Sequence, residues 1–277
     1  MQFFLDEFPL DVHVPQSLDF SIGNSECLSL KFDDPTIACD WYDRGYTITS
    51  FQDIYDFKDL LHVVECVVKA KLRVLFPHKN LANFSLSNYH NFVTEAEHSN
   101  YADSVLKRLC VADLSGISNV FIDLISSLIG APMGFKRTSD GSDHWIILRI
   151  NPPYSFAYNP PHKDIYEDFD SHGICPQMVN AWIPISGVNE LAGLGLAPGS
   201  HRLCEDSIIR SKAGSEMNGR KFSVNFIQSW NRSNRLINIV PSYGEMLCFS
   251  SHLVHGLGVN RNLDLTRVAL EFRLHKQ

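Results

Sequence analysis

The chain has 277 residues, of which 44% are hydrophobic and 20% are charged, so it can bury a large core. Its net charge of -7, with Lys and Arg scattered along the sequence, argues against a nucleic-acid partner and against a basic membrane-surface patch. Seven Cys without a CxxC pair, no signal-peptide pattern and no apolar run of about 18 residues predict a cytoplasmic protein with reduced, mostly buried thiols and no membrane span.

The N-terminal half reads as mixed and mostly helical. Residues 1–50 alternate short apolar pieces with Asp, Pro and Ser, which favours a strand or two between loops. From Phe51 to Leu72, apolar residues recur every three or four positions, and this period predicts an amphipathic helix that ends before Pro77. Two shorter helices are predicted at Tyr101–Leu109 and Ser118–Ile129.

After residue 130 the period changes towards two, which is typical of strands. The predicted strands are His144–Ile150, Met178–Ile185, Leu194–Ala197, Leu236–Val240, Glu245–Val254 and Thr266–Leu274. The turn sequences between them are Ser139-Asp140-Gly141, Pro198-Gly199-Ser200 and Ser242-Tyr243-Gly244. Helices first and strands after predict a mainly β fold, an antiparallel sandwich or barrel flanked by N-terminal α-helices. We expect one domain over 1–277, with a helical part at 1–130 and a β core at 131–277.

The last predicted strand has two chemically different faces, because side chains alternate along a strand. One face carries Val268, Leu270, Phe272 and Leu274, and the other carries Arg267, Ala269, Glu271 and Arg273. Either the polar face meets water, or helices cover the apolar face and the polar face lines a cavity. Alternation alone leaves both open.

His162 and Asp164 form the first candidate for chemistry. In an extended segment, residues two apart point the same way, so both side chains can reach one ion. Such a pair is also common in solvated loops, but here it follows a rigid, Pro-rich segment. Two imidazoles and one carboxylate on one face of an octahedral metal form the triad of non-haem Fe(II) oxygenases. The second imidazole would come from His255 or His252, and we prefer His255, at the end of the strand before Gly256.

The residues after His255 carry a resemblance to a known family. His255-Gly256-Leu257-Gly258-Val259-Asn260, followed by Arg267 and preceded by Gly244-Glu245, resembles the C-terminal signature of phytanoyl-CoA dioxygenase-like Fe(II)/2-oxoglutarate oxygenases. The segment from Asn180 to Arg202, with its Trp, Pro, Asn-Glu turn and Pro-Gly-Ser-His-Arg end, is similar to the family's central strands. The resemblance covers roughly residues 144–275.

The resemblance implies a double-stranded β-helix, a cupin-like jelly roll, with His162, Asp164 and His255 as iron ligands. It implies that Arg267 holds the distal carboxylate of 2-oxoglutarate, with Asn151 on the co-substrate and Trp182 near the iron. Leu257 departs from the family pattern, since a small hydroxylic residue is frequent there, and the spacing from His255 to Arg267 is one residue longer than usual. These departures concern the detailed hydrogen bonding of the co-substrate.

The expected reaction follows from the ligand set. Three protein ligands leave three metal positions, two for 2-oxoglutarate and one for O2, and the products include succinate and CO2. Arg149, Glu271 and Arg273 are candidates for binding a small, possibly anionic substrate; alternatively they form an internal ion pair or are solvated charges. The carboxylate of Asp164 argues against halogenation.

Other charged residues are assigned weaker roles. Lys163 points away from the metal, on the rim or in a structural role. His201 stabilises a turn. Asp168, Asp170 and His172 form an acidic loop that covers the site or is simply solvated.

Two other functions remain possible. A cupin-like isomerase or hydrolase could use the same ligands with Zn or Mn, and a non-catalytic jelly roll could bind a ligand such as a glycan. Neither needs Arg267 and Asn151 to hold a carboxylate. The oligomeric state and the identity of the substrate are not predicted.

Overall fold

The computed structural model describes residues 1–109, 114, 117–135, 146–155, 158–212 and 214–277. The turn predicted at Ser139-Asp140-Gly141 and the first two residues of the strand predicted from His144 lie outside this part of the chain.

The helical elements and strands follow one another in an order that mixes the two from the N-terminus onward. The helices and helical turns are α1 (Leu28–Lys31), α2 (Phe57–Leu75), η1 (Leu86–Asn91), α3 (Glu95–Glu97), the π-helical turn η2 (His98–Ala102), α4 (Asp103–Leu106), α5 (Ile117–Ile129), α6 (Tyr166–His172), η4 (Ser200–Arg202) and η5 (Glu205–Ser207). The strands are β1 (Gln2–Leu5), β2 (Phe8–Asp11), β3 (Ser21–Ile22), β4 (Tyr46–Ser50), β5 (Arg108–Leu109), β6 (Met133–Gly134), β7 (Ile146–Asn151), β8 (Met178–Ser186), β9 (Leu194–Leu196), β10 (Ile208–Arg210), β11 (Ser215–Met217), β12 (Arg220–Phe222), β13 (Ile227–Trp230), β14 (Arg235–Ile239), β15 (Glu245–Ser250), β16 (His255–Gly256) and β17 (Arg267–Lys276).

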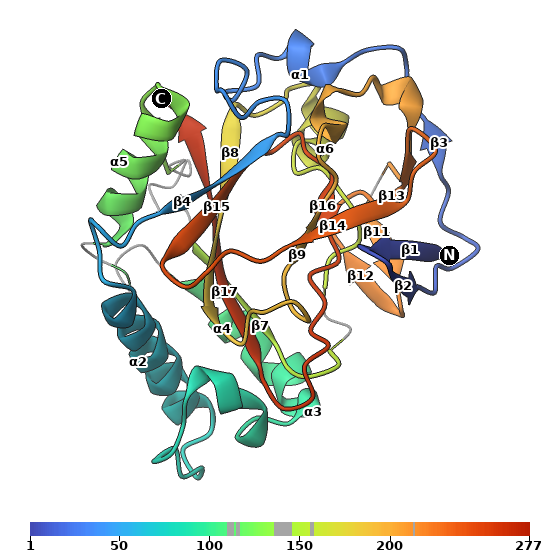
Figure 1. Cartoon of the computed structure of the whole chain (residues 1–277). Coiled ribbons are helices and arrows are strands. Elements are labelled where there is room, and N and C mark those ends of the chain that lie inside the picture. Colours follow the sequence, from blue (N-terminus) through green and yellow to red (C-terminus); the bar gives the residue numbers. More distant parts are fainter. Residues whose placement is uncertain (110–113, 115–116, 136–145, 156–157, 213) are drawn as a thin grey trace.

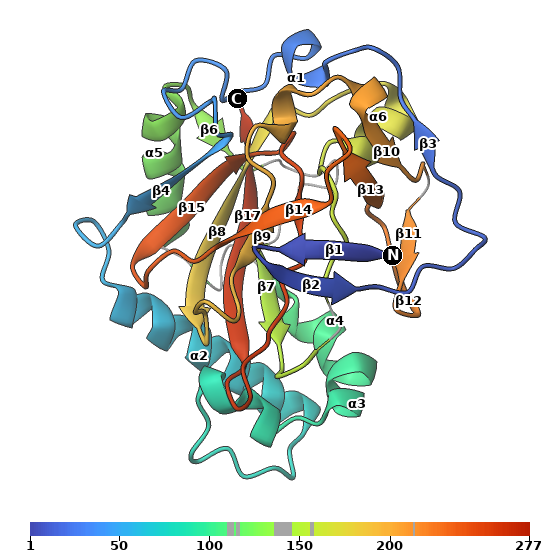
Figure 2. The ribbon, with the colours of Figure 1, turned by 45° about the vertical axis from the view of Figure 1, so that its right-hand side comes forward.

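Two sheets face each other across the interior (Figures 1 and 2). Among the described residues the larger sheet has seven strands, in the order β4-β15-β8-β17-β7-β5 with β6 beside β17, and the smaller has five, in the order β16-β9-β14-β1-β2. Their neighbouring strands are antiparallel except for β1 and β14. The mainly β jelly roll with flanking helices that the sequence predicts is thus confirmed.

Helices α2 and α5 cover the outer face of the larger sheet (Figure 1). Along α2 the buried side chains are Leu60, Val64, Val68 and Leu72, which recur at helical spacing. They belong to one hydrophobic core with the apolar side chains of β17, including Phe272 and Leu274. The helices therefore cover the apolar face of the last strand, and its other face is turned to the interior between the sheets. A separate apolar cluster around Trp182 and Phe249 fills that interior.

Local chemistry shifts several predicted helix boundaries. Helix α2 begins at Phe57, six residues later than predicted, because the Asp56 side chain caps it by accepting a hydrogen bond from the Lys58 N–H at 2.8 Å. The helix predicted at Tyr101–Leu109 is divided among the end of η2, α4 and β5. The helix predicted from Ser118 begins at Ile117.

The predicted strand Glu245–Val254 is also interrupted. It ends at Ser250, where the Ser250 carbonyl accepts from the Leu253 N–H at 3.0 Å and its hydroxyl accepts from the His252 N–H at 3.1 Å. His255 therefore begins β16 in the smaller sheet instead of ending a strand of the larger one.

The N-terminal residues contribute more strand than predicted. Strands β1 and β2 form an edge of the smaller sheet, and β4 forms an edge of the larger one. The expectation of mostly buried thiols was wrong: among the described Cys only Cys175 and Cys248 are buried, and Cys66 is exposed.

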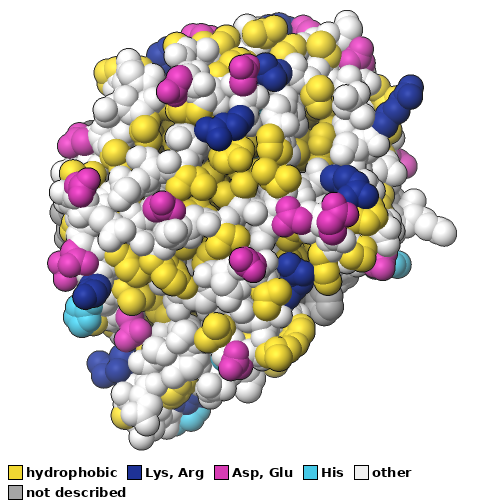
Figure 3. Space-filling view, viewed as in Figure 1, with side chains coloured by type: hydrophobic (Ala, Val, Ile, Leu, Met, Phe, Trp, Pro, Cys, Tyr) yellow, Lys and Arg dark blue, Asp and Glu magenta, His cyan; other side chains and the backbone are white. Residues whose placement is uncertain are grey.

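Figure 3 shows one face of the molecule, on which Lys and Arg side chains are scattered among hydrophobic and acidic ones. Within the described residues, no helix is both long and apolar enough to cross a bilayer.

Replacing Phe272 tests the packing between the sheet and its helices. Its ring is 2% exposed and lies 5.5 Å from the ring of Phe121. We expect Phe272→Ala to lower the free energy of unfolding by about 3–5 kcal/mol, measured by urea denaturation, because the cavity left behind loses its contacts. Val74→Ala on α2, where Val74 is 82% exposed, should change it by no more than about 0.5 kcal/mol. Equal effects of the two variants would contradict this packing.

Candidate metal centre and adjoining cavity

Backbone hydrogen bonds bring the HxD segment against the segment that ends in His255. The His162 N–H donates to the His255 carbonyl at 2.9 Å, and the His255 N–H donates to the His162 carbonyl at 3.0 Å. Two residues on, the Asp164 N–H donates to the Ser251 carbonyl at 3.1 Å. This short antiparallel pairing fixes the register of two segments that lie about ninety residues apart.

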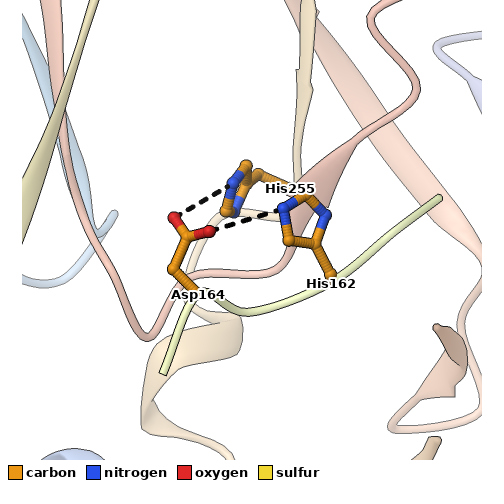
Figure 4. A group of neighbouring side chains, drawn as sticks. All are labelled: His162, Asp164 and His255. Carbon is orange, nitrogen blue, oxygen red and sulfur yellow. Dashed lines mark ion pairs between the residues drawn. The ribbon is translucent and has the colours of Figure 1, made fainter. Parts of the chain in front are cut away.

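The three side chains of this pairing converge (Figure 4). The His162 Nε2 lies 3.5 Å from one Asp164 oxygen, and the His255 Nε2 lies 3.4 Å from the other. One ligand atom from each residue lies within 4.8 Å of the other two, and all three residues are buried. Two ligand atoms about 2.1 Å from one ion and at right angles are about 3 Å apart. The donor set therefore fits a single divalent metal ion.

The outer nitrogen of each imidazole is held by a backbone carbonyl. The His162 Nδ1 lies 2.7 Å from the Pro160 oxygen, and the His255 Nδ1 lies 3.0 Å from the Leu253 oxygen. A carbonyl only accepts, so each Nδ1 carries the proton and each Nε2 presents its lone pair to the other ligands. Burial, with a further contribution from His162, lowers the pKa of His255 to about 4. It is neutral at pH 7, as a metal ligand must be.

Two donors hold the Asp164 carboxylate. The Asn180 amide donates to one oxygen at 2.6 Å, and the Arg273 guanidinium donates to the other at 2.6 Å. Burial alone would raise the pKa of Asp164, but Arg273, His255 and His162 hold it well below its usual value. Asn180 was not predicted as a site residue. It lies two residues before Trp182, so the two side chains share one face of β8.

A cavity begins at the two imidazoles. The predicted co-substrate residues Arg267, Asn151 and Trp182 line it, and so do Arg149 and Glu271. Further described residues line it without having been predicted: Tyr158, Asn159, Leu194 and Phe249.

Arg267 is a buried cation that faces this cavity. It is 2% exposed, and its guanidinium donates to the Asn151 side-chain oxygen at 2.7 Å and to the carbonyls of Ala192 and Gly193 at 3.1 and 3.0 Å. All three acceptors are neutral, and Arg267 forms no salt bridge with a described residue. Burial, with a further contribution from Arg149, lowers the pKa of Arg267 to about 10, so it stays charged at pH 7. Two of its five N–H donors have no described partner.

The glycines of the His-Gly-Leu-Gly motif make room for this arrangement. Gly256 has a φ of +147°, and a Cβ there would lie 2.5 Å from the Pro160 carbonyl oxygen, whose segment carries His162. A Cβ at Gly258 would lie 3.0 Å from the Arg267 Nη2. Asn260, which completes the motif, donates to the carbonyls of Asn151 and Leu265 at 2.8 and 2.7 Å and ties this loop to β7.

The three predicted substrate residues are all engaged in ion pairs. Arg149 donates to both carboxylate oxygens of Glu271, at 2.7 and 3.2 Å. Arg273 contacts Asp164 and is not among the described residues that line the cavity. Burial alone would raise the pKa of Glu271, but Arg149 and Arg273 lower it to about 2. The internal ion pair that the sequence left open forms between Arg149 and Glu271, and the role of these residues in substrate binding stays a prediction.

Lys163 points away from the triad into a buried network. Its ammonium lies 3.4 Å from Glu205, which also accepts from the Tyr166 hydroxyl at 3.1 Å. Arg210 approaches Glu205 at 3.5 Å and donates to both oxygens of Asp170, at 2.7 and 2.9 Å. Lys163 is 2% exposed, so it is structural and does not lie on the rim.

The prediction of an acidic loop after the triad was wrong. Asp168, Asp170 and His172 lie in helix α6, which the Asp170–Arg210 pair fixes to β10.

His252 and His201, which were also considered from the sequence, lie outside the triad. His252 is buried, and burial, with a further contribution from Lys163, lowers its pKa to about 3. His201 is buried in the turn η4 and packs edge-on against Tyr42 at 4.7 Å between ring centres, and its turn-stabilising role stays a prediction.

No protein-family model and no curated protein matches the sequence. Solved structures do. AviO1 from Streptomyces viridochromogenes Tue57 is 14% identical, with 88% of this chain and 95% of that one covered and a TM-score of 0.49. EctD from S. alaskensis, with 2-oxoglutarate and 5-hydroxyectoine, is 16% identical, with 96% and 86% covered and a TM-score of 0.48. The non-heme monooxygenase ThoJ, as a nickel complex, is 14% identical, with 85% and 75% covered and a TM-score of 0.44.

The resemblance to non-haem iron oxygenases that the motifs indicate is thus confirmed as a resemblance. At these identities and TM-scores it carries no argument about this chain's activity, which rests on the geometry described above.

Removing the Lys163 ammonium tests whether the buried network supports the HxD segment. We expect Lys163→Met to lower the free energy of unfolding by about 1–3 kcal/mol, because Glu205 loses a charged partner in a buried setting. It should also weaken Co(II) binding, measured by titration calorimetry, because the segment between the two metal ligands loses its anchor. Lys58→Met on the exposed start of α2 is the matched control. Unchanged stability in Lys163→Met would contradict the role given to the network.

The Arg149–Glu271 pair predicts a pH dependence of stability. The pKa of Glu271 is lowered from 4.5 to about 2, so its contribution is fully present above pH 4.5 and is lost as the pH falls towards 2. This loss amounts to roughly 3 kcal/mol. In urea denaturation at stepped pH, Glu271→Gln should lack this part of the acid destabilisation, whereas the exposed control Glu190→Gln should retain it. Identical pH profiles for all three proteins would refute the assignment.

Proposed function

We propose that this protein is a 2-oxoglutarate-dependent oxygenase that uses Fe(II) to oxidise a small molecule. The single observation that carries the proposal is the buried Arg267 guanidinium, without an acidic partner among the described residues, in the same cavity as His162 and His255. A buried cation among neutral acceptors is costly, and an anion that binds beside it removes that cost.

The dianion 2-oxoglutarate matches the two ends of this cavity. Its keto acid end can chelate a metal held by His162, Asp164 and His255. Its distal carboxylate can accept hydrogen bonds from the two N–H groups of Arg267 that have no partner among the described residues. A planar guanidinium suits a carboxylate better than an ammonium does. When bound, Fe(II), 2-oxoglutarate and O2 supply the oxidising power that removes hydrogen from a substrate, with release of succinate and CO2.

The chain's own residues perform the binding and orientation. The two carbonyl-anchored imidazoles and the Asp164 carboxylate, fixed by Asn180 and Arg273, present their ligand atoms in a preset arrangement. Trp182 lies 5.2 Å from the Arg267 guanidinium, and with Phe249 it makes one wall of the cavity apolar. An apolar wall excludes water, which strengthens the contact between Arg267 and a carboxylate.

Two alternatives are less well supported. A Zn- or Mn-dependent isomerase or hydrolase could use the triad, but it gives no reason for an unneutralised Arg267 in the cavity. A non-catalytic binding module gives no reason for the carbonyl-oriented imidazoles.

The activity is tested by succinate formation. Purified protein with Fe(II), ascorbate, O2 and 2-oxoglutarate should form succinate even without the primary substrate, at a slow uncoupled rate. His162→Ala and Asp164→Ala should abolish it, because the metal loses a ligand. The control His78→Ala alters an exposed histidine outside the cavity and should match the wild type.

Arg267→Gln should raise the 2-oxoglutarate concentration for half-maximal turnover about 10- to 100-fold, because a charged hydrogen bond is worth about 1.5–3 kcal/mol. Succinate formation that survives His162→Ala, or no Fe(II)-dependent binding of 2-oxoglutarate to the wild type, would overturn the proposal.

A further inference from the structure

A second cavity adjoins the first. Arg149, Asn151 and Asn159 line both. A substrate that reaches the metal from this side would keep its remaining atoms in the second cavity, so the chemistry of the second cavity bears on what the substrate is.

Three segments that are distant in sequence wall the second cavity. Strand β7 contributes Leu148, Arg149, Ile150 and Asn151 to its lining, with the side chains of Leu148 and Ile150 buried in the core beneath the helices. The η2–α4 segment supplies His98, Ser99, Asp103 and Lys107, and the β11–β12 hairpin supplies Arg220, Lys221 and Phe222. The Arg220 guanidinium donates to the Ser99 hydroxyl at 3.0 Å, which ties the hairpin to the helical segment. The cavity is therefore a defined structure and not a gap between unconnected loops.

The charge of this cavity is strongly one-sided. Among the described residues that line it, Lys107, Arg149, Arg220 and Lys221 are basic, and Asp103 alone is acidic. Arg149 is neutralised by Glu271, whereas Lys107, Arg220 and Lys221 form no salt bridge with a described residue. Lys107 is partly buried, and burial, with a further contribution from Arg149, lowers its pKa. On the face drawn in Figure 3, by contrast, basic side chains are scattered.

His98 adds a buried imidazole to the same wall. The residue is 4% exposed, and its Nδ1 lies 2.8 Å from the Tyr89 hydroxyl. Its Nε2 has no hydrogen-bond partner among the described residues, and the Asp103 carboxylate lies 3.9 Å from it. Burial lowers its pKa, so the ring is neutral at pH 7. In the tautomer whose Nδ1 accepts from the Tyr89 hydroxyl, the ring proton lies on Nε2. Buried polar groups are normally satisfied, and the π-helical turn that carries His98 is of a kind found often at functional sites.

We propose that this second cavity recognises an anionic group of the primary substrate, a phosphate, phosphonate or carboxylate, carried on a partly apolar body. Lys107, Arg220 and Lys221 supply the charge, the His98 Nε2 supplies a hydrogen-bonding group in the same wall, and Phe222 contacts the apolar part. That the bound anion belongs to the substrate rests on the proposed function. That the cavity binds an anion rests only on the residues that line it. Selectivity for an anion then comes from these basic residues of the second cavity and not from Arg149 and Arg273, which form ion pairs.

The test uses metal-free protein and three small probes: phenyl phosphate, benzoate and benzyl alcohol. Ligand-observed NMR titration should show binding of one or both anions and much weaker binding of the neutral alcohol. A preference between the two anions distinguishes a phosphate-like group from a carboxylate. Lys107→Gln and Arg220→Gln should each weaken anion binding about tenfold or more. Lys58→Gln, at an exposed lysine outside the cavity, should leave it unchanged.

Two further variants separate this site from its neighbour. Arg267→Gln should leave probe binding within about twofold if the anion sits in the second cavity and not on the co-substrate arginine. Fe(II)-dependent binding of 2-oxoglutarate should be unchanged in Lys107→Gln. Equal binding of benzyl alcohol and the anions, or anion binding that ignores Lys107 and Arg220, overturns the subsite and leaves the oxygenase proposal standing. Anion binding without any Fe(II)-dependent 2-oxoglutarate binding overturns the oxygenase proposal and leaves the subsite standing.

Discussion

The pairing of His162 with His255 through two backbone hydrogen bonds is the constraint on which the rest of the site depends. It joins a Pro-rich segment that follows β7 to the start of β16. The two imidazoles lie side by side because of these backbone hydrogen bonds, and no contact between side chains is needed. The carbonyls of Pro160 and Leu253 then select the tautomer that leaves Nε2 free. Asp164, two residues on in the same segment, completes the set because the extended backbone brings it to the same side.

A second constraint is electrostatic and concerns unpaired charge. The interior contains several charged side chains, and most are neutralised nearby: Glu271 by Arg149, Asp164 by Arg273, and Glu205 by Lys163 and Arg210. Among the described residues, Arg267 beside the triad and Lys107 and Arg220 in the second cavity form no salt bridge, and of these only Arg267 is fully buried. Because burying an unpaired charge is unfavourable, we expect an anion bound beside Arg267 to stabilise the fold. In the two proposals above, the cavities form one elongated site, with a co-substrate carboxylate in the first and a substrate anion in the second.

Much of the site near the metal could be predicted from sequence because its determinants are local. The two-residue spacing of His162 and Asp164 and the run from His255 to Asn260 are short patterns, and the parity of β17 correctly separates Arg267 and Glu271 from Phe272. The same alternation of side chains along β8 would have predicted that Asn180 shares the interior face with Trp182.

What the sequence did not reveal depends on distant segments meeting. Alternation through residues 251–254 imitates a continued strand, but the Ser250 turn ends it, so His255 begins a new strand and does not end the predicted one. Lys163 meets Glu205, and Arg220 meets Ser99, across separations of 42 and 121 residues. No local period encodes such contacts, and the basic cavity that Arg220 and Ser99 line was therefore not predicted. Which acidic residue pairs with Arg149 and which with Arg273 likewise depends on how distant strands and segments are placed in the fold.

A crystal structure of the protein prepared without oxygen, with Fe(II) and 2-oxoglutarate, tests the central claim most directly. The account predicts one metal ion within about 2.0–2.3 Å of His162 Nε2, His255 Nε2 and an Asp164 oxygen, with the keto acid end of 2-oxoglutarate on the metal and its distal carboxylate on Arg267. Metal bound elsewhere, or a co-substrate whose distal carboxylate avoids Arg267, would contradict it.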